Sequence, residues 1–157
     1  ESELIFLFQK FFNYKKPIYF RINKFNFENK YKLQKNNSAF YKKGNLTNLI
    51  TSGAVLNHIL SCLNAEEIDH LNIISIPILN HQYNKNINKL INKKRKTVFV
   101  CDSSKTLFFE EMKSNLPNKT KAINFDCDHN KIKKVGNYSF ILDTLGLNRK
   151  NLLKLLF

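Results

Sequence analysis

Leu46 to Leu63, LTNLITSGAVLNHILSCL, is the stretch of sequence that decides the fold. A short apolar run is followed by Ser52-Gly53, and then by a segment whose apolar residues recur at helical spacing. This order predicts a strand, a tight turn and a helix, with Gly53 allowing the backbone to reverse closely. Such a unit begins a βαβ crossover, in which the strand is buried and the helix covers the sheet.

The same alternation continues to the C-terminus. Ala39 to Tyr41 predicts a short strand ahead of the central unit, able to join the sheet antiparallel at an edge. Further patterns predict strands at 68–79, 97–101 and 121–125, and helical segments at 84–92, 105–115, 138–145 and 150–157. We therefore expect an α/β fold: a three-layer α/β/α, Rossmann-like domain with a mostly parallel sheet of about five strands, the first antiparallel.

The beginning of the chain is expected to be a separate unit. Glu3 to Phe12 predicts a short helix that is apolar nearly all round and is therefore buried on more than one side. Ile18 to Phe20 predicts a strand, and the polar, Asn-rich residues 22–37 predict a linker. A single helix and strand cannot make a sheet, so we place a domain boundary between residues 1–36 and 37–157 and expect the first unit to need a neighbour.

Charge and composition narrow the class of protein. The apolar content of 43% is enough for a packed core, which excludes a disordered chain. The net charge of +14 comes almost entirely from Lys and raises nucleic acid as a partner. Lys and Asn are both abundant, and the densest cluster, Lys93 to Lys96, follows a predicted helix, where cations suit the dipole. We therefore favour solvated faces and expect no nucleic-acid partner; a basic Rossmann-like module that binds nucleic acid or a ribonucleoprotein is the alternative.

The expected location is the cytoplasm. Cys62, Cys101 and Cys127 are an odd number without short spacing, which indicates neither a disulfide framework nor a zinc site. No apolar run approaches the roughly 20 residues of a membrane span. The first apolar stretch is interrupted by Gln9-Lys10 and lacks the cleavage site of a signal peptide, so we expect no membrane association.

Several motifs in this order resemble the C-terminal end of the transketolase superfamily of thiamin-diphosphate enzymes. The superfamily includes transketolases, deoxyxylulose-phosphate synthases and the beta chains of pyruvate-dehydrogenase-type complexes. The resemblance begins with a Pro-hydrophobic strand ending in Arg (Lys16 to Arg21) and a Gly-containing strand ending in Ser-Gly (Tyr41 to Gly53). It continues with an Asn-Ile pair that opens a helix (Asn86-Ile87) and an acidic residue at a strand end (Asp102). A following helix (Lys105 to Met112) and a closing Leu-Gly-Leu (Leu145 to Leu147) complete it.

This resemblance implies a role in a larger enzyme. Residues 1–36 would be the end of a pyrimidine-binding domain, and residues 37–157 a transketolase C-terminal-like domain serving interdomain and dimer packing. Thiamin diphosphate and Mg²⁺ would be held by upstream domains or a companion subunit, in a homodimer or heteromer. The chain itself would carry no catalytic, cofactor-binding or metal-binding residue, but Arg21 and Lys24 match positions that hold a substrate phosphate in the family.

Three other clusters are interpreted as structural. Asp126 to His129 offers four potential ligands, but consecutive residues cannot all face one ion, so a turn is expected. His58 and Cys62 lie one helical turn apart, which suits nucleophile activation. Since the sequence shows no third group to orient the pair, we interpret it as helix surface. Ser103-Ser104 is interpreted as a helix cap.

Overall fold

The computed structural model describes residues 2–19, 33–36, 39–78, 85–101, 107–114, 116, 120–125 and 135–157. The described helices are α1 (Ser2–Phe11), α2 (Gly53–Cys62), α3 (Ala65–His70), α5 (Leu107–Lys113), α6 (Tyr138–Thr144), α7 (Arg149–Leu156) and the 3₁₀ turn η1 (Lys85–Lys89). The described strands are β1 (Gln34–Asn36), β2 (Ala39–Lys42), β3 (Thr47–Thr51), β4 (Leu71–Ser75), β5 (Thr97–Val100) and β6 (Ala122–Phe125).

The strands form one six-stranded sheet in the order β1-β2-β4-β3-β5-β6. The four strands β4, β3, β5 and β6 run parallel, whereas β2 is antiparallel to β4 and β1 is antiparallel to β2. The expected α/β fold with a mostly parallel sheet and an antiparallel first strand is therefore present, with one more strand than the sequence predicted.

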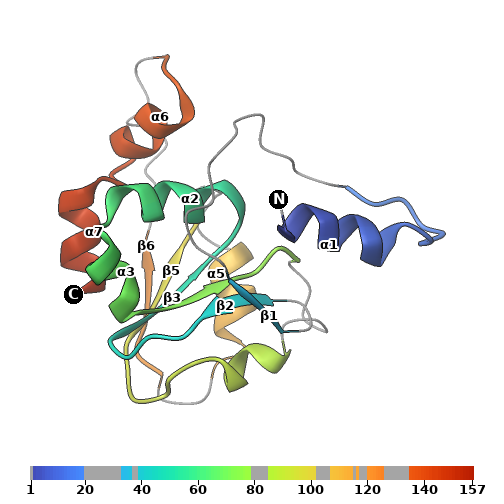
Figure 1. The fold of residues 1–157 in the computed structure, drawn as a ribbon, viewed down its shortest axis with the longest axis horizontal. Coiled ribbons are helices and arrows are strands. Elements are labelled where there is room, and N and C mark those ends of the chain that lie inside the picture. Colours follow the sequence, from blue (N-terminus) through green and yellow to red (C-terminus); the bar gives the residue numbers. More distant parts are fainter. Residues whose placement is uncertain are drawn as a thin grey trace.

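Helices pack on both faces of this sheet (Figure 1). Leu49 of β3 belongs to a buried cluster built with α2, α3, α6 and α7, through side chains such as Ile59, Leu142 and Leu152. Its neighbour Ile50 points to the opposite face, in a second cluster completed by η1 and α5. A parallel strand buried on both faces needs apolar residues at successive positions, which explains the continuous apolar runs of β3, β4 and β5.

A buried polar network joins the central strands at their amino-terminal half. The Asn48 side chain is fully buried; its Oδ1 accepts hydrogen bonds from Asn72 Nδ2 of β4 at 2.7 Å and from the Asn92 backbone N–H at 2.9 Å. Its Nδ2 donates to Asn92 O at 2.9 Å and to Thr97 Oγ1 of β5 at 3.1 Å. The network therefore ties β3 to both neighbouring strands and to the loop after η1.

Two differences concern the segments before β4 and β2. Residues 65–70, partly expected to be strand, form α3 because Asn64 begins a capping box: its side chain accepts from Glu67 N–H, and Glu67 Oε2 accepts from Asn64 N–H, both at 2.8 Å. Of the predicted 68–79 strand, residues 71–75 are strand, residues 68–70 and 76–78 are not, and residue 79 lies outside the described residues. Gln34–Asn36, expected to be linker, forms β1 by main-chain pairing with β2. Its polar residues suit a sheet edge.

The N-terminal segment also differs from expectation. The helix is present as α1, but only one side is covered: Phe6 is buried, whereas Ile5 and Phe8 are exposed. The strand expected at 18–20 is not seen at residues 18 and 19, and Phe20 lies outside the described residues.

The helix expected at 84–92 is the short 3₁₀ turn η1. The remaining predicted helices and strands are found within a few residues of their expected bounds.

Among the helices that the structure describes, none has the length and apolar character needed to cross a membrane.

We predict that Asn48→Ala lowers the free energy of unfolding by about 3 kcal/mol, because it leaves the buried Asn72 amide and Asn92 N–H without one of their acceptors. Urea denaturation measures this. The matched control is Asn45→Ala at an exposed position, for which we expect a change within about 0.5 kcal/mol. Equal effects of the two substitutions would contradict the role given to the network.

Candidate functional site

The two residues predicted to contact a substrate phosphate, Arg21 and Lys24, lie outside the described residues. Asp102, Ser103-Ser104 and the cluster from Asp126 to His129 lie outside them as well. The structure therefore neither brings these side chains together nor separates them. The sites that can be built from described residues are the carboxyl edge of the sheet and a cluster between α2 and α6.

The carboxyl edge is where an open α/β sheet ordinarily binds ligands, at the point where the connections of two neighbouring strands diverge. Here the chain leaves β3 toward β4 on one side, and leaves β5 toward β6 on the other. Thr51, the last residue of β3, is fully buried, and its Oγ1 has no hydrogen-bond partner among the described residues. Ser52 begins α2 without a side-chain cap bond, and Gly53 adopts a φ of 56° with open space at its Cβ position.

Helix α1 reaches this edge through Glu3. The Ser75 hydroxyl, at the end of β4, donates a hydrogen bond to Glu3 Oε1. Burial raises the pKa of the Glu3 carboxyl, and the Ser75 hydrogen bond opposes that shift only in part. One turn further, the ring of Phe6 packs edge-on against that of Phe40 of β2, with 5.8 Å between the ring centres. Lys35 Nζ of β1 lies 4.3 Å from the Phe6 ring centre. The helix is therefore docked on the edge by one carboxyl and one aromatic ring.

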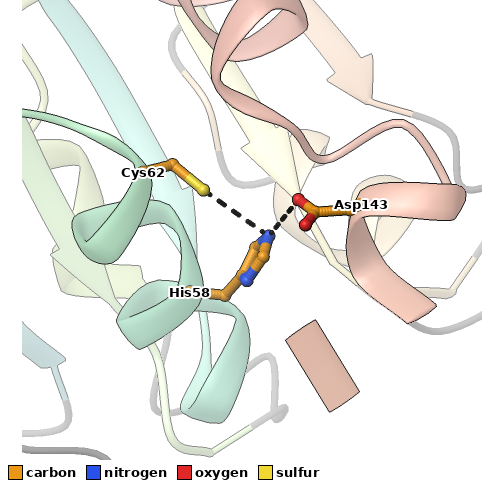
Figure 2. Close-up of side chains that lie close together, drawn as sticks. All are labelled: His58, Cys62 and Asp143. Atoms are coloured by element: carbon orange, nitrogen blue, oxygen red, sulfur yellow. Dashed lines mark hydrogen bonds and ion pairs between the residues drawn. The ribbon is translucent and has the colours of Figure 1, made fainter. Parts of the chain in front are cut away.

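The second cluster joins His58 and Cys62 of α2 to Asp143 of α6 (Figure 2). His58 Nε2 lies 3.5 Å from Asp143 Oδ1 and 3.7 Å from Cys62 Sγ, and its nearest neighbour is Leu147 O at 2.7 Å. The His58 side chain is only 2% exposed, whereas Asp143 is 52% exposed. The expectation that this pair lies on the helix surface is therefore wrong for His58, because α6 and the turn after it cover this face of α2.

This arrangement does not activate Cys62 as a nucleophile. Because a carbonyl only accepts, the close contact with Leu147 O assigns the proton to His58 Nε2, which then cannot take a proton from the thiol. Burial raises the pKa of Cys62, and the negative charge of Asp143 raises it further, against smaller opposing effects of Ser61 and Arg149. A reactive cysteine needs the opposite shift.

Sequence analysis predicted that His58 and Cys62 lie one helical turn apart, but it did not identify Asp143 as their neighbour. The helix α6 itself was predicted, and its Asn137 cap is formed, with Asn137 Oδ1 accepting from Phe140 N–H at 2.9 Å. No local pattern states which helix α6 packs against, because that depends on how the chain returns to the α2 face of the sheet. Only the three-dimensional fold reveals this third group.

Comparison with known proteins gives no relative: no family model matches the chain, and no curated protein and no solved structure is significantly similar to it.

The geometry at the carboxyl edge predicts a pH dependence of stability. A carboxyl with a raised folded-state pKa holds its proton more tightly in the folded chain, so stability falls as the pH rises from about the ordinary value of 4.5 through the raised pKa. We expect Glu3→Gln to weaken this dependence and to stabilise the chain at neutral pH, because Gln removes the buried charge and can still accept the Ser75 hydrogen bond.

Urea unfolding of both proteins between about pH 5 and pH 8 measures the effect. Glu66→Gln, at an exposed position in the first turn of α3, is the matched control and should leave the dependence unchanged. A pH dependence that is the same in the native chain and in Glu3→Gln would show that Glu3 is not the responsible group.

Proposed function

We propose that this chain is the C-terminal portion of a transketolase-like, thiamin-diphosphate-dependent enzyme, and that it serves interdomain and dimer packing rather than catalysis. The observation that carries the proposal is the sheet from β2 onward. It has five strands, of which the first is antiparallel and the other four parallel, with helices on both faces. This arrangement is compatible with the three-layer, Rossmann-like domain that the resemblance of the sequence implies.

The exposed side of α1 supports a packing role. Phe12 is 83% exposed, Tyr19 is 88% exposed, and Ile5 and Phe8 are about half exposed. Ile5 and Phe8 lie in α1, Phe12 directly follows it, and Tyr19 lies further along the chain. Several exposed large apolar side chains in one part of the chain mark a surface that binds another protein. Burying each of them is worth roughly 1.5–3 kcal/mol, so a partner that covers several gains considerably. In the proposed enzyme, the partner is the rest of the pyrimidine-binding domain or a companion subunit.

In the proposed enzyme, the partner binds the cofactor and carries out catalysis. Thiamin diphosphate and Mg²⁺ belong to the upstream domains or the companion subunit, and the assembly is a homodimer or heteromer in the cytoplasm. Arg21 and Lys24 remain the proposed contacts to a substrate phosphate. The Arg21 guanidinium can bind phosphate through two hydrogen bonds at once, whereas the Lys24 ammonium would act as a point charge.

The alternative, a basic module for nucleic acid, is less well supported by the distribution of charge. The sequences of α2, α3 and α6 contain no Lys or Arg. Within the described helices, cations lie in α1, η1, α5 and α7, and therefore over both faces of the sheet; they include Lys10, Lys89, Lys113, Lys150 and Lys154. The cluster Lys93 to Lys96 lies outside these helices. A nucleic-acid site gathers its cations on one face, and its binding weakens steeply with salt.

The function is tested by measuring thiamin diphosphate in two preparations. We expect calorimetry with thiamin diphosphate and Mg²⁺ to show no binding by this chain alone. We expect the assembly that copurifies with the tagged chain from its source cells to contain thiamin diphosphate. Micromolar binding by the isolated chain would show that the active site has been misplaced, and an assembly without the cofactor would contradict the family proposal.

The proposed domain boundary predicts the result of a deletion. Removing residues 1–36 takes away α1 and the three-residue strand β1; among the side chains described there, Phe6 is buried and Leu33 is partly buried against the main core. We expect residues 37–157 to unfold cooperatively in urea and to be more soluble, because the exposed apolar side of α1 is gone. Loss of cooperative unfolding would show that the chain is one integrated domain.

A further inference from the structure

We propose that His58, Cys62 and Asp143 form a binding site for a divalent transition metal of the zinc class, which joins α6 to α2. One nitrogen, one sulfur and one oxygen ligand atom lie within 4.8 Å of one another (Figure 2). This mixed set of imidazole, thiolate and carboxylate is one that Zn²⁺ accepts, whereas Mg²⁺ and Ca²⁺ prefer oxygen alone. The inference is independent of the proposed function, because it uses only side chains of this chain.

The two distances from His58 Nε2 to the other ligand atoms fit a tetrahedral ion. With Zn–N and Zn–O bonds of about 2.1 Å and a Zn–S bond of about 2.3 Å, tetrahedral geometry places nitrogen about 3.4 Å from oxygen and about 3.6 Å from sulfur. The observed distances from His58 Nε2 are 3.5 Å to Asp143 Oδ1 and 3.7 Å to Cys62 Sγ. The third separation, between Cys62 Sγ and the Asp143 carboxylate, is within 4.8 Å, against about 3.6 Å in a tetrahedral site, so these two side chains close in on each other when both hold the ion.

The hydrogen bonds to Leu147 O do not account for the approach of Asp143 to His58 Nε2. His58 Nε2 has a single proton, and Leu147 O accepts it at 2.7 Å. Asp143 Oδ1 and Cys62 Sγ are further electron-rich atoms gathered around the same nitrogen, beyond what one N–H can serve. The Cys62 thiol donates a weak hydrogen bond to the same Leu147 O, at 4.0 Å. Several donor atoms around one point resemble the shell of a cation more than that of a single proton.

The exposure of the three side chains indicates the side from which an ion enters the site. His58 is enclosed, Cys62 is partly buried, and Asp143 is half exposed, so the ion enters from the Asp143 side. On binding, the imidazole proton moves from Nε2 to Nδ1, and the Cys62 thiol releases its proton to solvent. Leu147 O or a water molecule completes the four ligands. The ion would then clamp α6 onto α2, two helices that lie far apart in the sequence.

The test uses the full chain, stripped of metal and titrated with Co²⁺, which substitutes for zinc and absorbs strongly when a thiolate is a ligand. We expect one Co²⁺ per chain, a thiolate-to-cobalt absorption band, displacement of Co²⁺ by Zn²⁺, and a higher melting temperature with Zn²⁺. Cys62→Ser should abolish the band. Asp143→Asn should keep it but weaken the affinity by more than about tenfold.

Matched controls separate this site from others. Cys101→Ser and Cys127→Ser replace the other two cysteines of the sequence, and Asp69→Asn replaces another exposed carboxylate; none should change the band or the affinity. Absence of the band in the native chain would overturn the proposal, as would a band that survives in Cys62→Ser. If Cys62→Ser does not fold, the native spectrum and the half-exposed Asp143→Asn decide the question, because an unchanged affinity in Asp143→Asn would also overturn it.

Discussion

The structure depends on the buried hydrogen bonds of Asn48 in the central strand β3. Its amide contacts β4 through Asn72, β5 through Thr97, and the loop after η1 through Asn92. A buried amide with specified partners tolerates no other pairing, since a slip by one residue would leave these groups unsatisfied and turn every side chain of β3 to the other face. The apolar residues of β3 supply the driving force for burial, and Asn48 selects the register in which they are buried.

This register decides where the functional groups lie. With β3 fixed, Thr51 ends the strand at the carboxyl edge, and α2 begins at Gly53. Helix α2 then packs beside α7, whose end accepts a hydrogen bond from Thr47 Oγ1 to Leu156 O at 2.6 Å. Arg149 of α7 forms two hydrogen bonds to the Glu67 carboxylate, at 2.6 and 2.9 Å, and lowers the pKa of that carboxyl. These contacts hold α7 against β3 and α3, and a further hydrogen bond from Arg149 to Cys62 O, at 2.7 Å, joins α7 to the end of α2.

Much of the fold could be predicted from the sequence, because β3, β5, α2 and α7 each carry their own apolar period. The capping box of Asn64 and Glu67 was also readable, but the apolar residues from Ile68 onward led to a strand assignment across it. The polar strand β1 carries no such period, since it is held through its main chain. The meeting of Asp143 with His58 joins two separate helices and leaves no local signal.

We propose that the exposed apolar side of α1 joins this chain to a thiamin-diphosphate enzyme. The most direct measurement is hydrogen–deuterium exchange of Ser2–Phe11 in the free chain and in the assembly isolated from its source cells. Since a covering partner suppresses the local opening that permits exchange, the account predicts slower exchange of these amides in the assembly, together with the presence of thiamin diphosphate. Equal exchange rates of α1 in the free chain and in the assembly would contradict it.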